Sequence, residues 1–218
     1  MNKFEIIDGV LEKYTGNDKH IIIPDGIIEI KFRAFCMCNE LECIDIPESV
    51  IEIGNRIFDH CQNLKNVSLP HAVKIPRDEV GISSCMFAGC KSLESFIIPN
   101  GSDVIGDGAF SSCYKLTSIT IPETVTYIYD DAFNRCESLT SIYIPKSVSG
   151  IGISVFGGCT KLKKIFYGGE NMEQWESLKR GKRPIQYKNM TVYFYSEIKP
   201  KDEGNFWHFG DDGIPTVW

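Results

Sequence analysis

A spacing of 23 residues repeats along most of this chain of 218 residues. A proline that follows the pattern apolar-x-apolar returns after 23, 23, 29, 23 and 23 residues, and three other residue types keep the same spacing. In each of the six copies, a cysteine comes three residues after the recurring phenylalanine, and a leucine comes three residues after that cysteine. Six copies in one register predict a solenoid in which each unit stacks on the next. The recurring residues are Pro24, Pro47, Pro70, Pro99, Pro122 and Pro145; Phe35, Phe58, Phe87, Phe110, Phe133 and Phe156; Cys38, Cys61, Cys90, Cys113, Cys136 and Cys159; Leu41, Leu64, Leu93, Leu116, Leu139 and Leu162.

The fifth copy shows what one unit contains. Residues 118–121 alternate polar and apolar, which is the pattern of a strand with one buried face. Pro122 lacks a backbone donor and ends the pairing of that strand. Residues 130–136 are too few for a long helix, and we expect one or two helical turns there. One unit cannot bury its own apolar side chains, so stacked units are expected to align their phenylalanines in an internal column.

The pattern LxxIxIPxxVxxIxxxxFxxCxxL resembles the leucine-rich repeats of the bacterial BspA-like family, over roughly residues 20–168. Two departures stand out: Ser102 replaces the valine, and Tyr167 with Gly168 replaces the final Ile-Pro, so the array is expected to end there. The resemblance implies an α/β, strand-rich leucine-rich-repeat solenoid. It further implies a curved, right-handed array with a parallel sheet on one face that is used for binding.

The two ends carry signals of caps, which a solenoid needs because its terminal units would otherwise expose the core. Asp8 and Gly9 are typical of a two-residue β-hairpin turn. Near the other end, ENMEQWESLK has apolar residues three apart and predicts a short helix, and TVYFYSE predicts a last strand. We therefore expect an N-terminal cap at residues 1–19, repeats at 20–168, a C-terminal cap at 169–195 and a tail at 196–218 that forms a closing hairpin.

One copy is longer than the others. The step from Pro70 to Pro99 exceeds the usual spacing by six residues, and the stretch from His71 to Gly81 carries several charges. Insertions in repeat arrays usually become loops. The sequence predicts an exposed bulge that leaves the ladder of strands undisturbed.

Net charge and apolar runs exclude some classes of partner. The net charge of −6 argues against nucleic acid and against docking on anionic lipid. No apolar run approaches the roughly 18 residues that predict a membrane-spanning helix, so we expect no membrane insertion. The start of the chain shows no signal peptide, which favours a cytoplasmic protein. The family resemblance offers an alternative: a cell-surface or secreted adhesin whose export signal is missing from this sequence.

Nine cysteines raise the possibilities of disulfides and metal binding. Six of them share one phase of the repeat, which favours buried, reduced packing residues. Cys36, Cys43 and Cys85 fall at phases filled by polar residues in other copies, so we expect these three to reach solvent. Cys36 and Cys38 form a CxC without a second ligand pair, and we expect no metal site.

Catalysis lacks a recognisable signature. The four histidines are scattered, and neither a nucleophile motif nor a phosphate-binding loop is present, so we expect no enzyme activity and no cofactor. The alternative is an enzyme with its site in the C-terminal cap. The basic run at 179–184 is expected to close the C-terminal side of the cap helix rather than to bind nucleic acid.

The outward-facing positions of the sheet are the remaining candidates for function. Aromatic side chains gather toward the C-terminal end of this face, as at binding hot spots. The alternative is that these rings only cover the C-terminal cap. We interpret the chain as a non-catalytic scaffold that presents this face to a protein or a glycan, with its oligomeric state left open. The candidate ligand-binding residues are Ile97, Thr120, Tyr143, Lys164, Phe166 and Tyr193.

Overall fold

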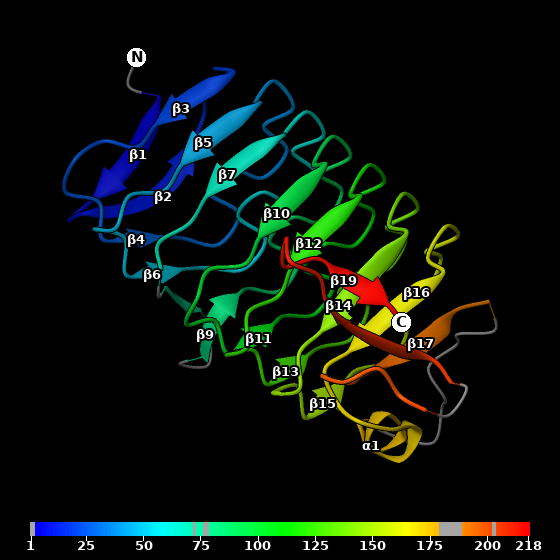
Figure 1. The fold of residues 1–218 in the computed structure, drawn as a ribbon. Coiled ribbons are helices and arrows are strands. Elements are labelled where there is room, and N and C mark those ends of the chain that lie inside the picture. The colour runs from blue at the N-terminus through cyan, green and yellow to red at the C-terminus, as the bar shows by residue number, and fades with distance from the viewer. Residues whose placement is uncertain (1–2, 72, 76–78, 179–188, 202–203) are drawn as a thin grey trace.

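A computed structural model describes residues 3–71, 73–75, 79–178, 189–201 and 204–218, and it shows a stack of chain turns with two rows of short strands (Figure 1). One row forms a nine-stranded sheet, here called the side sheet. It contains β1 (Phe4–Ile7), β2 (Val10–Tyr14), β4 (Glu29–Ile30), β6 (Glu52–Ile53), β8 (Lys74–Ile75), β9 (Glu79–Ile82), β11 (Val104–Ile105), β13 (Tyr127–Ile128) and β15 (Gly150–Ile151).

The other row, here called the face, is divided into sheets of three, two and five strands. The first is β3 (His20–Ile22), β5 (Cys43–Asp45) and β7 (Asn66–Ser68). The second is β10 (Ser95–Ile97) and β12 (Ser118–Thr120). The third is β14 (Ser141–Ile144), β16 (Lys164–Tyr167), β17 (Thr191–Tyr195), β18 (Phe206–Phe209) and β19 (Pro215–Val217). The single helix of the described residues, α1 (Met172–Ser177), lies between β16 and β17 in the chain.

Strands of neighbouring copies pair in parallel at the spacing of the repeat. Ile21 lies opposite Ile44 in β3 and β5, and Ile142 lies opposite Ile165 in β14 and β16. The middle residue of each short face strand points into the core and its two neighbours point outward, as the polar–apolar alternation predicts. The expected solenoid with a parallel sheet is confirmed.

The recurring phenylalanines stack through the centre of the molecule. Adjacent rings from Phe35 to Phe156 have centroids 5.3 to 6.1 Å apart and planes within 18° of parallel. All six rings are buried. The internal column is therefore present, and it runs the length of the array without interruption.

The segment before each cysteine differs from the sequence expectation. Instead of one or two helical turns, residues 130–136 form consecutive tight turns, with N–H···O bonds from Asn134 to Asp131 and from Cys136 to Phe133. Asp131 and Arg135 have φ values of 55° and 60°, in the left-handed region that interrupts a right-handed helix. The prediction of helical turns is wrong because each copy places two left-handed residues there.

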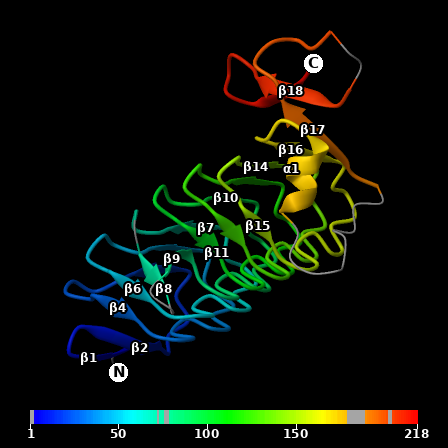
Figure 2. The ribbon, with the colours of Figure 1, turned by 90° about the horizontal axis from the view of Figure 1, so that it is seen from below.

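Both ends of the stack are covered (Figure 2). The β1–β2 hairpin turns at Asp8 and Gly9, both with positive φ, and places Leu11 and Tyr14 over the first copy. At the other end, α1 begins after Asn171, whose side-chain oxygen accepts from the Gln174 N–H at 3.0 Å. The caps named in the fold expectation, a hairpin at one end and a helix with strands at the other, are confirmed. The basic run at 179–184 lies outside the described residues.

The six-residue insertion enters the side sheet. Its first strand, β8, pairs in parallel with β6 and antiparallel with β9, so an extra strand separates two consecutive copies. On the face, no ladder joins β7 to β10 among the described residues. The expectation of a bulge that leaves the ladder undisturbed is therefore wrong.

Candidate functional site

The outward positions of the face differ in how far they reach solvent. Ile97 on β10 is 75% exposed, and Thr120 on β12 is also exposed. Tyr143 on β14 is half-buried, whereas Phe166 on β16 is only 6% exposed. Lys164 begins β16 and is exposed, and Tyr193 on β17 is half-buried. Ile97, Thr120 and Lys164 are therefore openly accessible, whereas the three aromatic members of the predicted set are half-buried or buried.

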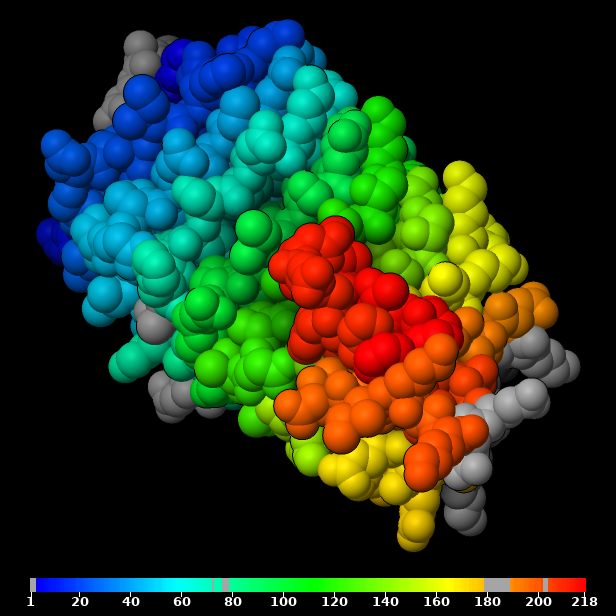
Figure 3. Space-filling view, viewed as in Figure 1, coloured from blue at the N-terminus to red at the C-terminus, as the bar shows by residue number. Residues whose placement is uncertain are grey.

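The C-terminal tail explains the change along the face. The β18–β19 hairpin continues the third face sheet and folds back over it, as the red atoms in Figure 3 show. Trp207 on β18 is fully buried, and its indole N–H donates to the Tyr167 carbonyl at 2.8 Å. The indole meets the rings of Tyr143 and Phe166 at centroid distances of 5.3 and 5.7 Å.

Phe166 therefore needs a correction. Its ring is covered by Trp207 and packs against Tyr193 at 5.5 Å, so it is buried instead of lying open on the face. The alternative given by the sequence, that these rings only cover the C-terminal end of the array, describes Phe166 better, although the element in contact with the ring differs. The covering element is the tail hairpin rather than α1. One feature of the sequence indicated this role, namely the aromatic residues on both sides of the GDDGIP turn.

Beside the covered rings lies a groove between the face and the tail, here called the tail groove. It has a volume of about 360 Å³ and opens between β12 and β14, which have no ladder between them in the described part of the chain. Its rim is apolar, because Ile214 is 59% exposed and Phe209 is also exposed. The lining residues are Thr117–Ile121, Ser141–Tyr143, Phe166, Phe209 and Gly213–Pro215.

Tyr143 is held in place at the floor of the tail groove. Its hydroxyl donates a short hydrogen bond to the Glu123 carboxylate from the neighbouring copy. Burial, followed by the contact with Glu123, raises the pKa of Tyr143 far above its usual range, so the hydroxyl stays neutral. Phe209 meets the ring edge-on at 5.7 Å. Thr120, Tyr143 and Ile214 thus line one groove, while Lys164 and Tyr193 do not line it.

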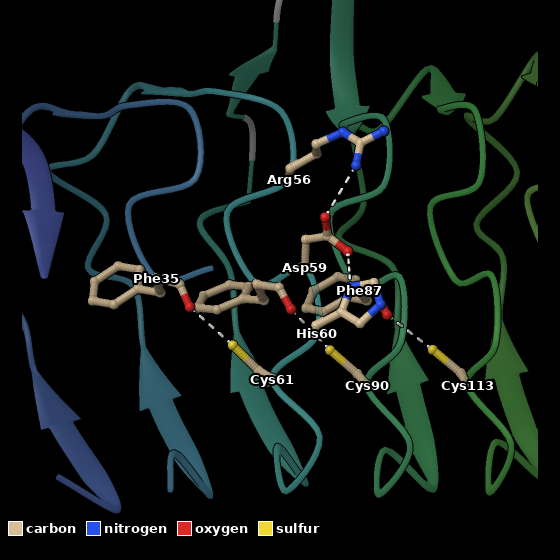
Figure 4. Close-up of polar contacts among 9 residues, drawn as sticks. Phe35, Arg56, Asp59, His60, Cys61, Phe87, Cys90 and Cys113 are labelled. Carbon is tan, nitrogen blue, oxygen red and sulfur yellow. Dashed lines mark hydrogen bonds and ion pairs between the residues drawn. The ribbon is translucent and has the colours of Figure 1, made fainter. Parts of the chain in front are cut away.

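The cysteines of the repeat form hydrogen bonds that the sequence interpretation as packing residues did not include (Figure 4). Five buried thiols donate to the carbonyl of the phenylalanine in the preceding copy, at 3.0 to 3.3 Å. We call this row the thiol ladder; it contains Cys61, Cys90, Cys113, Cys136 and Cys159.

The exposure of the remaining cysteines agrees only in part with expectation. Cys38, expected to be buried, is half-buried. Cys36, Cys43 and Cys85 are half-buried as well, so they reach solvent without being fully exposed. All nine cysteines are free, and the described residues contain no group of three or more His, Cys, Asp or Glu side chains placed to hold a metal ion.

A buried carboxylate lies on the outer side of the column (Figure 4). Asp59 is 3% exposed and accepts from Arg56 at 3.1 Å and from the Nδ1 atom of His60 at 2.6 Å. Sequence reasoning missed this cluster because the phase of Asp59 is filled by Cys36 and Ala88 in the adjacent copies. Both partners come from the same turn, so the arrangement ties that turn together.

A family profile described as the BspA type Leucine rich repeat region matches residues 12–80 and 80–177, with six copies. This chain belongs to the BspA-type leucine-rich repeat family. The resemblance given by the repeat motif is therefore confirmed.

Solved structures similar to this BspA-type repeat protein come from bacteria. The T. pallidum leucine-rich repeat protein is 30% identical, with a TM-score of 0.64 over 73% of this chain and 77% of that one. A leucine-rich cell surface protein from Faecalibacterium prausnitzii A2-165 is 29% identical, with a TM-score of 0.52. That match covers 72% of this chain and 50% of the F. prausnitzii protein.

A third similar structure is a leucine-rich repeat protein from Bacteroides ovatus ATCC 8483. It is 24% identical, with a TM-score of 0.54 over 88% of this chain and 57% of that one, and at this identity it supports the fold alone. No curated protein matches the sequence significantly. In the described part of this BspA-type repeat protein, no helix has the length and apolar character needed to cross a membrane.

Proposed function

We propose that this protein is a non-catalytic binding module that holds a segment of a partner protein in the tail groove. The observation that carries this proposal is the groove itself, which lies between a fixed face and a hairpin whose rim exposes Phe209 and Ile214. Exposed apolar side chains beside anchored aromatic rings are typical of protein interfaces. Ile97 extends the accessible apolar area toward β10.

Membership of a family of repeat scaffolds supports the non-catalytic role. Repeat arrays present side chains on a fixed frame, and the frame here is held by the phenylalanine column and the thiol ladder. A glycan is the alternative ligand of the same groove, because Tyr143 and Phe209 offer aromatic surface beside the hydroxyl groups of Thr117 and Thr120.

The test compares three immobilised proteins: the wild type, a Thr120→Arg, Ile214→Asp variant, and a Lys115→Glu variant as control. The double variant places two charges in the groove, whereas Lys115 is exposed and does not line it. We expect the wild type and the control to capture the same proteins from a lysate and the double variant to lose them. Each captured protein is then purified and its direct binding measured. Equal direct binding by all three would refute the proposal, and binding to a glycan panel alone would replace the protein partner with a glycan.

The proposed binding role is compatible with two cellular locations. A binding module suits the expected cytoplasmic location, and it equally suits a cell surface, where the name of the F. prausnitzii relative places that protein. Protease treatment of intact cells distinguishes the two, because only a surface protein is cleaved while the cells remain closed.

A further inference from the structure

On the side sheet, the insertion separates two successive copies by the width of one strand; the two copies are counted here from β6 through Phe58 to β7 and from β9 through Phe87 to β10. β8 lies between β6 and β9, with Lys74 opposite Glu52 on one side and opposite Val80 on the other. Neighbouring strands in a sheet are about 4.8 Å apart, so β6 and β9 are about 10 Å apart instead. In the side sheet, the space between β6 and β9 is thus occupied by β8, which is part of the insertion.

At the phenylalanine column the same two copies are in direct contact. The Phe58 and Phe87 rings stack at 5.6 Å, and the Phe58 N–H donates to the Met86 carbonyl at 3.0 Å. Between the column and β8, side chains connect the copies: the Ser83 hydroxyl donates to the Gly54 carbonyl at 3.0 Å. These two copies therefore diverge: they are in contact at the phenylalanine column and are separated at the sheets.

On the face, the separation of these two copies leaves a cleft between β7 and β10, here called the insertion cleft. It has a volume of about 550 Å³ and lies on the side seen in Figure 3, between the cyan and green parts of the chain. Val67 and Leu69 are half-buried in its wall, although the same positions in the neighbouring copies, Ile44 and Ile98 among them, are buried. The cleft therefore exposes part of the apolar core.

The β7 wall of the insertion cleft carries backbone groups without a strand opposite. In a parallel ladder, alternate residues direct their N–H and C=O groups to opposite sides of the strand. The Ile46 N–H donates to the Ser68 carbonyl at 3.1 Å, so Ser68 faces β5. Val67 and Leu69, one residue before and after it, face the cleft.

On the other wall, formed by β10, alternate residues likewise direct their backbone groups into the cleft. The Ile98 N–H donates to the Thr120 carbonyl at 3.1 Å, so Ile98 faces β12. Ser95 and Ile97 therefore direct their backbone groups toward β7. No backbone hydrogen bond joins the two walls within the described ranges of β7 and β10.

The ionic side chains at the rim already have partners within the protein, and Asp45 accepts a hydrogen bond from the Ser68 hydroxyl at 2.7 Å. Lys65 contacts Glu42 at 2.7 Å, and His71 contacts Glu48 at 2.8 Å. The walls offer a new occupant mainly backbone hydrogen bonds and apolar surface. A peptide backbone is the chemistry that satisfies two facing rows of N–H and C=O groups at once.

We propose that the insertion cleft binds an extended segment of a partner protein, which enters as an additional parallel strand between β7 and β10. The segment has the pattern apolar-x-apolar, because its two inward side chains meet the core beside Val67 and Leu69. Its middle residue points outward, next to Ser68 and Ile97. The second unpaired junction of the face, between β12 and β14, differs, because Ile119 and Ile121 stay buried there. No residue lines both the insertion cleft and the tail groove, so this proposal is independent of the proposed function.

The probe is a fluorescent peptide with the sequence of residues 115–124, KLTSITIPET, which contains one apolar-x-apolar pair. The control peptide has aspartate in place of both isoleucines. We expect saturable binding of the first peptide to the whole protein by fluorescence anisotropy, and binding of the second to be weaker by about tenfold or more. Equal binding of the two peptides would refute the proposal.

Two further measurements locate the binding. Deleting residues 74–79 restores the 23-residue spacing and is expected to let β6 pair with β9, which closes the cleft and abolishes peptide binding; binding by a folded deletion variant would overturn the proposal. In the wild type, NMR hydrogen exchange is expected to slow at Val67, Leu69 and Ile97 when the peptide is added, and to stay unchanged at Ser68. Slowing confined to residues outside the cleft, or a peptide-free dimer that closes it, would also overturn the proposal. The exchange experiment remains decisive if the deletion variant does not fold.

Discussion

Cysteine suits its position in the repeat for two reasons, which are the small size of its side chain and the hydrogen bond that its thiol donates. The side chain is small enough to lie between stacked copies, and its S–H donates to a carbonyl that also accepts a backbone N–H within its own turn. Phe110 illustrates this, because its carbonyl accepts from the Cys136 thiol at 3.3 Å and from the Cys113 N–H at 3.2 Å. The thiol therefore occupies the second lone pair of a buried carbonyl, which would otherwise be unsatisfied.

The phenylalanine column sets the largest cost of a single substitution. Phe133 is fully buried between Phe110 and Phe156, and Phe133→Ala leaves a cavity that stacked neighbours cannot fill. We expect a loss of about 3–5 kcal/mol in the free energy of unfolding. Thr120→Ala, on the exposed face, is expected to change it by less than about 0.5 kcal/mol. Denaturant melts measure both, and equal losses would contradict the assignment of the inner and outer faces.

The cysteines provide a second test. Burial raises the pKa of the Cys90 and Cys113 thiols, which keeps them protonated and unreactive. We expect a thiol reagent to modify only half-buried cysteines such as Cys43 in the native protein, and to reach the thiol ladder after denaturation. Cys43→Ser serves as the control and should remove one of the early-reacting groups. Early modification of Cys113 or Cys136, identified by mass spectrometry, would show that the ladder is open to solvent.

Some residue-scale features could be read from the sequence and others could not. The period alone identified the phenylalanine column and the phase of the cysteines. It did not reveal the left-handed turn residues, since Arg33, Met37 and Arg135 are not types that mark positive φ. Glycine appears at the same phases in other copies, at Gly108 and Gly158, and that recurrence was the available signal. The half-burial of Val67 was also unpredictable, because it depends on the insertion in the next turn.

At the scale of elements, the six added residues behave as a strand and not as a loop. Lys74 and Ile75 alternate polar and apolar like other side-sheet strands, but two residues give too little pattern to predict pairing. The gap that they fill exists only because the neighbouring copies diverge. Whether a strand pairs across such a gap depends on how whole copies stack, so the pairing of β8 could not be predicted from its own residues.

Ion pairs also connect consecutive copies. Glu42 contacts Lys65 at 2.7 Å and Lys19 at 2.9 Å, each 23 residues away. The hydrogen bond from Lys65, followed by that from Lys19, lowers the pKa of Glu42 to about 2. A lowered carboxyl pKa contributes stability above its ordinary value near 4.5, and this contribution is lost as the pH falls toward 2.

The Glu42→Gln substitution tests this coupling. We expect the variant to be less stable than the wild type at pH 7, with a difference that shrinks below about pH 4.5 and vanishes only below about pH 2. The midpoint of denaturant unfolding at several pH values measures it. Lys65→Met, which removes the first partner, should reproduce part of the effect. A difference that does not change with pH would show that the exposed ion pairs do not couple the copies.

At the scale of the whole molecule, the tail hairpin closes the array over its last face strands. Trp207 is the centre of this closure, because its indole contacts Tyr143, Phe166 and Tyr195 and donates to the Tyr167 carbonyl. The sequence predicted a closing hairpin in the tail but gave no indication of the surface on which it would lie. That surface lies about 40 residues upstream in the chain, and only the stacked fold brings the two together.

Trp207→Ala tests whether the tail is a separable part of the fold. We expect hydrogen exchange to accelerate in β18 and β19 while β5 and β12 keep their protection, because repeat arrays couple mainly between neighbours. Trp218→Ala is the control, since that indole is exposed and stacks on His208 at 3.8 Å. Loss of protection along the entire array would show that the tail is needed for global folding.

The joint at the insertion, where β7 and β10 are separated on the face, also determines how the molecule would yield to tension. In a stack whose stability is a sum of interfaces between neighbours, the weakest interface is the one that lacks a face ladder and also leaves Val67 and Leu69 only half-buried. A force applied to the two chain ends therefore parts the array first beside Leu69. The two halves each retain an end cap and their share of the phenylalanine column, so they rupture later and independently. A stretched molecule would lengthen in discrete steps, and the first step would leave two folded blocks joined by the released insertion.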